Sequence, residues 1–227
     1  MTDKYGAVIR GNPAKRNVSL VFTGDEFRDG LPHISQVLEK KNVKGAFFVT
    51  GKFLEDNKSA KLLSNLSKKG HLVGPHSDQH LLYAPWENRD SLLVTKSEFV
   101  DDLEKNVQCL EKNGIKRGDI FIPPYEWYNK KIVDWSAERE FEVYNFTPGL
   151  RTPADYTYPQ MGTRYMSSEK ILNQLYEYER ANGLNGYIIL VHLGTDARRV
   201  DKLYWRLEQI IDELRSKKYN FVSLENL

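Results

Sequence analysis

The alternation of short apolar runs with longer amphipathic segments constrains this chain more than any other feature of its sequence. Runs rich in β-branched and aromatic residues predict strands, and helical spacing of apolar residues between these runs predicts helices. Strands are expected at Val18–Phe22, Gly45–Val49, His71–Gly74, Asp119–Ile122, Glu142–Thr147, Tyr187–His192 and Tyr219–Ser223. Helices are expected at Leu31–Lys41, Lys58–Lys69, Ser97–Asn113, Lys130–Glu140, Ser168–Ala181 and Lys202–Lys218.

Strands and helices that alternate along a chain are typical of parallel strands joined by helical crossovers. About seven such units favour a closed barrel over an open sheet, so we expect an α/β protein with a (β/α) barrel. The chain has 227 residues, of which 40% are hydrophobic, which is enough for one large core and not for two. We therefore expect a single domain over residues 1–227.

Charge and composition exclude several classes of partner. Lys and Arg number 33 against 31 for Asp and Glu, so the formal charge of +2 gives no electrostatic reason to expect nucleic-acid binding. No run approaches the roughly 20 apolar residues of a membrane-spanning helix, and Met1–Gly11 lacks the apolar centre of a signal peptide. Cys109 is the only cysteine, which excludes an internal disulfide. Neither the compartment nor the oligomeric state follows from these features.

Ionisable and polar residues collect just after the predicted strands. In barrels and in open parallel sheets alike, ligands meet the loops that follow the carboxyl ends of the strands. The segments in question are Thr23–Glu26, Gly74–His80, Pro123–Glu126 and Val191–Asp196. We expect any functional site to be built from these four segments.

His76 and His80 are the first candidates for a metal site. Two histidines four residues apart lie on one side of a helical turn, where both imidazoles can reach one ion. Asp25, from another strand end, would complete a set of three ligands that leaves positions open for water and substrate. Two surface histidines in a turn are the alternative, but their position directly after a strand favours a ligand pair. For His192, at the end of an apolar strand, the residues alone leave a functional and a purely structural role equally open.

The order of four motifs resembles that of the polysaccharide deacetylases, a superfamily that includes chitin, chitooligosaccharide and peptidoglycan deacetylases. These motifs are F-T-G-D-E-F, H-S-D-Q-H, I-P-P-Y and L-V-H, and the resemblance runs from about Val18 to Leu224. The most specific match is to the family motif H-[ST]-x-x-H. The resemblance implies a distorted (β/α) barrel, one divalent ion, most simply zinc, held by Asp25, His76 and His80, and removal of acetyl groups from the amines or hydroxyls of an acetylated glycan. Members of the family are often secreted or periplasmic.

The chain departs from the family pattern at the position of the catalytic base. Gly24 stands where the family has an aspartate base, and Ile122 stands where it has an arginine that supports the base. The family's fourth motif, an aspartate and a tryptophan after the fifth strand, is not recognisable in Thr147–Arg151. The resemblance therefore implies the metal ligands and the acid, but it does not identify the base.

The resemblance also implies a mechanism for acetyl hydrolysis. A bound zinc ion would lower the pKa of its water to about 7 and polarise the acetyl carbonyl, and the backbone N–H of Tyr125 would help to stabilise the oxyanion. His192, with an ordinary pKa of about 6.5, would protonate the leaving group. Glu26 is the first candidate for the missing base and Glu126 the second. A third possibility is that the ion needs no dedicated base.

Aromatic residues near the predicted rim could bind the sugar rings of a glycan. Flat aromatic faces can pack on pyranose rings, and Trp86, Tyr125 and Trp127 are our candidates for this role, although many of the rim aromatics could equally be core residues. Trp135 and Trp205 fall in helical patterns and are expected to be packing residues. The main alternative to an enzyme is a carbohydrate-binding protein that keeps the barrel and the metal site but has lost catalysis. A different metal hydrolase on a barrel is a weaker alternative, because the order of the motifs argues against it.

Overall fold

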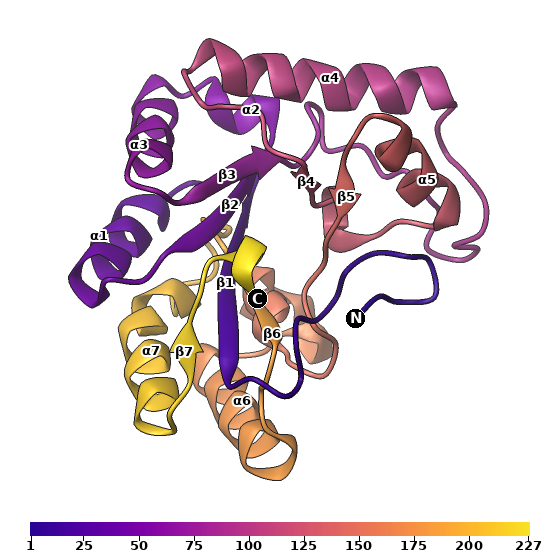
Figure 1. Cartoon of the computed structure of the whole chain (residues 1–227). Coiled ribbons are helices and arrows are strands. Elements are labelled where there is room, and N and C mark those ends of the chain that lie inside the picture. The colour runs from indigo at the N-terminus through magenta and orange to yellow at the C-terminus, as the bar shows by residue number, and fades with distance from the viewer.

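The computed structural model describes all residues from 1 to 227 and contains two parallel sheets (Figure 1). The larger sheet has the strand order β3-β2-β1-β6, and a fifth strand, β7, also pairs with β1. The smaller sheet contains β4 and β5. The strands span β1 Asn17–Gly24, β2 Gly45–Val49, β3 Leu72–Pro75, β4 Ile120–Phe121, β5 Glu142–Val143, β6 Tyr187–His192 and β7 Asn220–Phe221.

Isolated backbone hydrogen bonds connect the two sheets into a distorted (β/α) barrel. On one side, the N–H of Ile122 donates to the carbonyl of Pro75 at 3.4 Å, which links β4 to β3. On the other side, the N–H of Thr147 donates to the carbonyl of Ile188 at 3.0 Å, which links the chain after β5 to β6. Seven strands in a barrel confirm the predicted fold class. The distortion arises because β4, β5 and β7 are each only two residues long.

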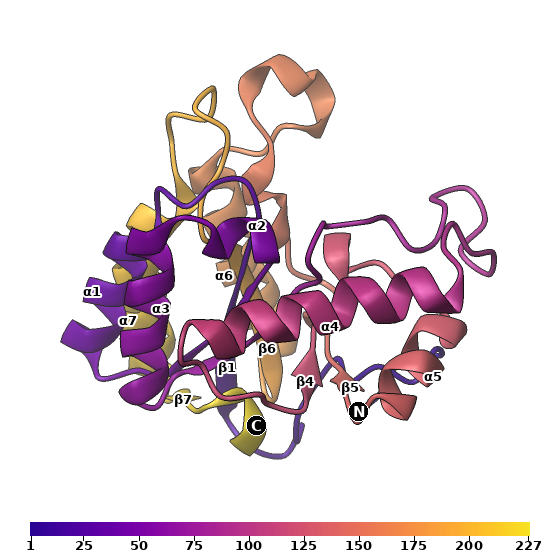
Figure 2. The ribbon, with the colours of Figure 1, turned by 90° about the horizontal axis from the view of Figure 1, so that it is seen from above.

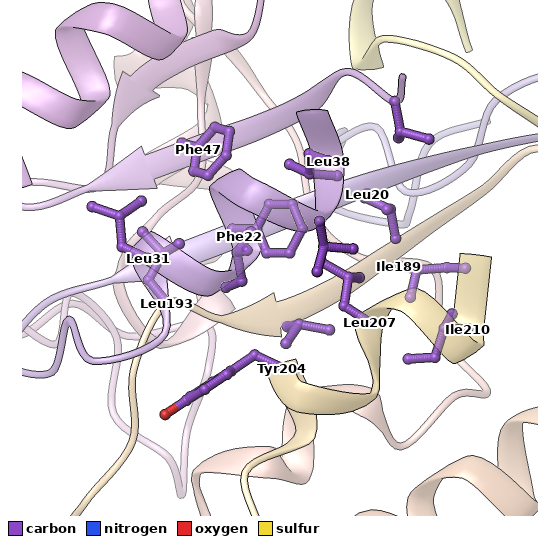
Figure 3. Close-up of a cluster of buried hydrophobic side chains, with 14 of the residues drawn as sticks. Leu20, Phe22, Leu31, Leu38, Phe47, Ile189, Leu193, Tyr204, Leu207 and Ile210 are labelled. Atoms are coloured by element: carbon purple, nitrogen blue, oxygen red, sulfur yellow. The ribbon is translucent and has the colours of Figure 1, made fainter. Parts of the chain in front are cut away.

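Side chains that point alternately outward and inward along the strands form two layers of the hydrophobic core. In β1, Val18, Leu20 and Phe22 face outward and join a cluster of 34 buried residues between the strands and the helices. Val21 faces inward and joins a cluster of eight residues that fills the barrel interior. Because successive side chains of a strand point to opposite faces, one strand serves both layers. Figure 3 shows the outer layer, where Phe22 and Phe47 lie together and Leu38 and Leu207 lie near Phe22.

Seven α-helices cover the barrel, and Figure 2 shows α4 lying along the side of β4 and β5. None of the helices is long and apolar enough to cross a membrane. The α-helices are α1 Leu31–Lys41, α2 Gly51–Leu54, α3 Asn57–Lys68, α4 Lys96–Lys112, α5 Lys130–Glu138, α6 Ser168–Asn182 and α7 Leu207–Ser216. Short 3-10 helices are η1 Pro124–Glu126, η2 Thr152–Tyr156, η3 Pro159–Arg164, η4 Leu203–Arg206 and η5 Leu224–Asn226.

The predicted elements agree with the structure except at their ends and in the loops. The helix predicted at Lys202–Lys218 is divided into η4 and α7, and the four-residue helix α2 was not predicted. The prediction for Trp205 as a packing residue is wrong, because this side chain is 56% exposed. Trp205 lies in the short 3-10 helix η4, where apolar spacing alone does not show which side chains the barrel covers.

Candidate active site

The turn after β3 carries the two histidines of the predicted ligand set. His76 is buried, its backbone N–H donates to Asn106 Oδ1 at 2.8 Å, and its ring Nδ1 donates to the carbonyl of Ile122 at 2.7 Å. His80 has a left-handed backbone, with φ of 56°, and its N–H donates to Ser77 Oγ at 2.9 Å. Since Nδ1 of His76 is a donor, Nε2 of the neutral ring keeps its lone pair. This orientation suits a metal ligand.

Helix α4 holds this turn in place through a buried carboxylate. Asp102 Oδ1 accepts hydrogen bonds from the backbone N–H groups of Asp78 and Gln79, at 3.2 and 2.8 Å. Its other oxygen accepts from the hydroxyl of Tyr83 at 2.7 Å. Together with Asn106, one turn further along α4, Asp102 ties the turn between His76 and His80 to a long helix.

Asp25 follows β1 and lies next to His80. Thr50, which directly follows β2, donates its hydroxyl to Asp25 Oδ1 at 2.9 Å, and Oδ2 of Asp25 lies 3.6 Å from His80 Nδ1. Two donor atoms bound at about 2.1 Å to one tetrahedral zinc are roughly 3.4 Å apart, so this separation fits a shared ion. The rings of His76 and His80 have centroids 5.1 Å apart. The structure has no group of three His, Cys, Asp or Glu side chains gathered tightly enough to hold an ion, so the ligand set stays a prediction.

Burial keeps both turn histidines neutral. It lowers the pKa of His76 to about 3, with a further contribution from His80. Burial also lowers the pKa of His80 to about 4, helped by the charge of His192. At neutral pH both imidazoles therefore offer lone pairs, which cation binding requires.

His192 ends β6 and is paired with a buried carboxylate that the sequence analysis missed. Its ring Nδ1 donates to Asp155 Oδ1 at 2.5 Å, and its backbone N–H donates to Asp155 Oδ2 at 3.0 Å. Although burial opposes the charged form, the Asp155 carboxylate raises the pKa of His192 to about 9. His192 is therefore protonated at neutral pH. Its pKa lies above the ordinary histidine value of about 6.5 that the sequence analysis used.

A sequence signal for Asp155 existed. Asp155 and Tyr156 form an aspartate–aromatic pair in the loop after β5, beyond the segment Thr147–Arg151 in which the fourth motif was sought. Arg199, which is fully buried, fixes the same loop by donating to the carbonyls of Thr157 and Met166. The sequence analysis missed this motif because Asp155 lies four residues beyond Arg151, where the search for the motif ended. The loop brings the Asp155 carboxylate to His192 at the end of β6.

The structure places the two candidate bases very differently. Glu26 is exposed to solvent. Glu126 has a side chain that is only 10% exposed, and its Oε1 lies 3.9 Å from His76 Nε2 without a hydrogen-bond partner. Burial raises the pKa of Glu126, against the opposing charge of His192. Tyr125 and Glu126 both have positive φ, 60° and 52°, a conformation that costs non-glycine residues energy and is concentrated at functional sites.

Gly24 has no room for the aspartate that the family pattern would place there. A Cβ at this position would lie 2.7 Å from Phe53 Cε2 and 2.9 Å from Leu193 Cδ1. Both of these side chains are fully buried in the outer core. Apolar side chains therefore pack against the backbone of Gly24 where the family has an aspartate. Ile122, which stands where the family has an arginine, is buried in the barrel interior.

The aromatic candidates lie together beside the turn histidines. The Tyr125 ring lies 4.3 Å from that of His80, and Trp86 lies 5.7 Å from Tyr125 and 5.3 Å from Trp127, measured between ring centroids. Other aromatic residues near the rim fall into two groups, core and exposed. Tyr83 and Tyr128 are buried in the core, whereas Tyr156 is 51% exposed and packs edge-on against His192.

The chain is similar to several known proteins. The chain is 28% identical over 228 residues to the peptidoglycan-N-acetylmuramic acid deacetylase PdaA of Bacillus subtilis, covering 100% of this chain and 77% of that protein. A solved peptidoglycan N-acetylglucosamine deacetylase matches the fold with a TM-score of 0.78 at 22% identity, over 98% of this chain and 92% of the other. A CE4 family pseudoenzyme from Bacillus anthracis matches with a TM-score of 0.74 at 19% identity, over 99% and 69%.

The sequence profile of the polysaccharide deacetylases matches residues 10–145, more than half of the chain. The matched stretch includes β1 to β5 and the turn with both histidines. On this evidence the chain belongs to the polysaccharide deacetylase family.

Proposed function

We propose that this protein is a metal-dependent hydrolase that removes N- or O-linked acetyl groups from an oligo- or polysaccharide. The observation that carries the proposal is the pairing of His192 with the buried carboxylate of Asp155. The pair supplies a protonated imidazole, His192, in the same site as the neutral imidazoles of His76 and His80. Their different surroundings suit His192 to act as an acid and the other two to act as metal ligands. A general acid beside a set of neutral ligands is the arrangement that hydrolysis of an acetyl amide or ester requires.

Asp25, His76 and His80 are the residues that would hold the ion. Support comes from the free Nε2 of His76, set by its Nδ1 contact with Ile122, and from the 3.6 Å separation between Asp25 and His80. Zinc is the ion we propose, because two imidazoles and one carboxylate with an open position form a catalytic zinc site in several metal-dependent hydrolases. When bound, it would lower the pKa of a water molecule and polarise the acetyl carbonyl.

The protein's own groups account for the proton transfers. Glu126, whose buried Oε1 has no partner, takes the proton of the attacking water in this proposal, in preference to the exposed Glu26. The backbone N–H of Tyr125 supports the oxyanion. His192 donates the proton from Nε2 to the departing amine or alkoxide, while Asp155 holds Nδ1 and keeps the ring oriented.

Acetate release tests the proposal. Acetylated xylan, chitooligosaccharides and cellooligosaccharide esters, each incubated with the protein and added Zn²⁺, should include at least one series that yields acetate. His192→Ala should then lower kcat on that substrate by about 10² to 10⁴ without changing the zinc content, since general acids contribute about this factor. The double variant His76→Ala, His80→Ala should retain no zinc by elemental analysis while keeping the native circular dichroism spectrum. Full zinc content in the double variant would refute the ligand assignment.

A second function is favoured by one observation. Phe53 and Leu193 close the space in which the family's base would lie, and one structural relative is described as a pseudoenzyme. The alternative is a carbohydrate-binding protein that keeps the barrel and the metal site without catalysis. Saturable glycan binding by wild-type protein with no acetate release from any substrate series would establish this function in place of the first.

A further inference from the structure

Two loops at the carboxyl ends of the strands surround the pair of His192 and Asp155. One loop, residues 152–167, contains Asp155, and the other, residues 193–202, directly follows His192. Figure 2 shows both loops projecting from the same side of the molecule. Neither loop contains a strand, so the sheet does not fix the Asp155 carboxylate relative to the His192 ring. Side-chain contacts between the two loops must do this.

The side chain of Arg199 makes these contacts. Its Nη1 donates to the carbonyls of Thr157 and Met166 at 2.5 and 2.9 Å, and its Nη2 donates to Ser168 Oγ at 3.0 Å. Thr157 and Met166 lie at the two ends of the segment 158–165, which contains no buried residue. The guanidinium therefore closes the neck of this exposed segment from the inside.

Thr157 connects Arg199 to the carboxylate of Asp155. The Thr157 hydroxyl donates to the carbonyl of Ala154 at 2.7 Å and accepts from the N–H of Met166 at 3.1 Å. Ala154 directly precedes Asp155, whose side chain is fully buried. The hydrogen bonds that begin at Arg199 thus fix the backbone on both sides of Asp155.

The surroundings of Arg199 favour a role in geometry over one in stability. Its side chain is fully buried, and its one ion-pair partner is Asp201, a partly exposed carboxylate whose Oδ1 lies 3.6 Å from Nε. Because most acceptors of the guanidinium are neutral carbonyls, the cost of removing its charge from water is only partly offset. The planar fork of arginine holds several acceptors in one fixed arrangement, which an apolar side chain of similar size could not do.

We propose that Arg199 is a positioning residue for the proposed general acid: by closing the neck of the segment 158–165, it holds the Asp155 carboxylate against the His192 ring. The inference rests on the proposed function for the role of His192. Arg199 contacts neither ring nor carboxylate directly through a hydrogen bond, so it acts through the loop. Its loss should lower kcat wherever the leaving group needs a proton and should hardly change KM.

Turnover of substrates with different leaving groups tests this role. Arg199→Met fills a similar space without the fork, and it should lower kcat on the acetylated glycan that yields acetate by about 10²-fold, the effect of a displacement of about 1 Å. Hydrolysis of an activated aryl acetate should fall much less, because its leaving group hardly needs a proton. Arg199→Lys keeps the charge but not the fork and should be similarly slow. Thr157→Val, which removes only the linking hydroxyl, should show a smaller loss in the same direction.

NMR titration of His192 in metal-free protein with nitrogen-labelled histidine provides a readout without substrate. The carboxylates of Asp155 and Glu126 raise the pKa of His192, and the charge of Arg199 lowers it. Loss of the Arg199 charge alone would therefore raise this pKa further, whereas release of the Asp155 carboxylate would lower it. We expect the pKa of His192 to fall in Arg199→Met towards its value in Asp155→Asn. An unchanged or raised pKa would overturn the inference.

Lys217→Met is the matched control, because it also removes a cation from a network with a buried carboxylate, that of Glu179. Lys217 precedes β7 and His192 ends β6, so the two residues lie at opposite ends of strands that run parallel to β1. Lys217→Met should leave the pKa of His192 and the ratio of glycan to aryl acetate turnover unchanged. If Arg199→Met does not fold, Arg199→Lys and Thr157→Val provide the same comparisons.

The outcomes separate this inference from the proposed function. Acetate release by the wild type, with Arg199→Met behaving like Lys217→Met, would leave the proposed function intact and remove only the positioning role. Equal losses on the glycan and on the aryl acetate would also overturn the positioning role. The expected fall in the pKa of His192, in a protein that releases no acetate from any substrate series, would support the positioning role and refute the hydrolase.

Discussion

At the scale of single residues, the pairing of His192 with Asp155 decides what the imidazole can do. A histidine with an ordinary pKa of about 6.5 would be mostly neutral at pH 7.5. With the Asp155 carboxylate overcoming the effect of burial, the pKa rises to about 9, and the ring stays charged across the neutral range. A general acid must be protonated before it can act, so Asp155 sets the pH range of the proposed reaction.

The variant Asp155→Asn should move the alkaline limb of the pH profile. In the wild type, kcat/KM on an amide substrate should fall as pH rises through about 9, where His192 loses its proton. Without the carboxylate, burial still opposes the charged ring and only the smaller contribution of the Glu126 charge favours it, so the limb should move to lower pH and activity at pH 8 should drop strongly. The measurement is kcat/KM from pH 5 to 10. An unchanged alkaline limb would mean that another group limits the reaction.

The same pair also makes stability depend on pH. Because the pKa of His192 is about 9 in the folded protein and about 6.5 when unfolded, its contribution is fully present below pH 6.5 and is lost as pH rises through 9. The difference in Tm between wild type and Asp155→Asn should therefore be largest in acid and shrink towards pH 10. This readout requires no substrate and no metal.

At the scale of elements, helix α4 positions the histidine turn. Asp102 accepts three hydrogen bonds from that turn and from Tyr83, and it is 4% exposed. Its removal leaves the N–H of Gln79 and the hydroxyl of Tyr83 without this partner, and each such loss is costly. The N–H of Asp78 keeps its second acceptor, the backbone carbonyl of residue 102, at 3.1 Å. The turn between His76 and His80 should then sample other conformations, although both histidines remain.

We predict that Asp102→Ala lowers the free energy of unfolding by about 1–3 kcal/mol and weakens zinc binding by about 10- to 100-fold, as changes beside metal ligands commonly do. Urea denaturation and calorimetric titration with Zn²⁺ measure the two effects. Asp101→Ala is the control, since Asp101 lies exposed on the same helix and should change stability by no more than about 0.5 kcal/mol. Equal zinc affinity in the two variants would show that α4 does not position the turn.

At the scale of the whole molecule, β1 joins both layers of the core. Its outward residues pack under the helices, and its inward residue Val21 fills the barrel with residues of β2, β4 and β6. A substitution that destabilises one layer of the core should therefore also destabilise the other. For this reason we propose that residues 1–227 unfold as one catalytic domain.

Phe22→Ala provides the test. Phe22 is fully buried and stacks on Phe47 at 5.2 Å between ring centroids, so its truncation should lower the free energy of unfolding by about 3–5 kcal/mol. Calorimetry should show a single transition in both wild type and variant, displaced to lower temperature in the variant. Val200→Ala, at a position that is 74% exposed, should leave the transition in place. Two separate transitions would contradict a single domain.

The sequence by itself determined the strands, the helices and the order of the motifs. Apolar periodicity is a local property, so the β/α alternation, the strand ends and the H-S-D-Q-H turn could be located from neighbouring residues alone. The match of that turn to a family motif predicted the family, and the comparisons confirm it.

Only the tertiary structure decided which side chains meet. His192 and Asp155 are 37 residues apart in the chain, and their contact depends on how the loop after β5 returns to β6. The choice between Glu26 and Glu126 depends on side-chain direction, and the positive φ values at Tyr125 and Glu126 turn one carboxylate inward in a way that no pattern of residue types encodes. Whether Gly24 leaves an empty space depends on Phe53 and Leu193, which reach it from other elements. Such contacts are fixed by long-range packing, because loops have no repeating geometry from which their directions could be extrapolated.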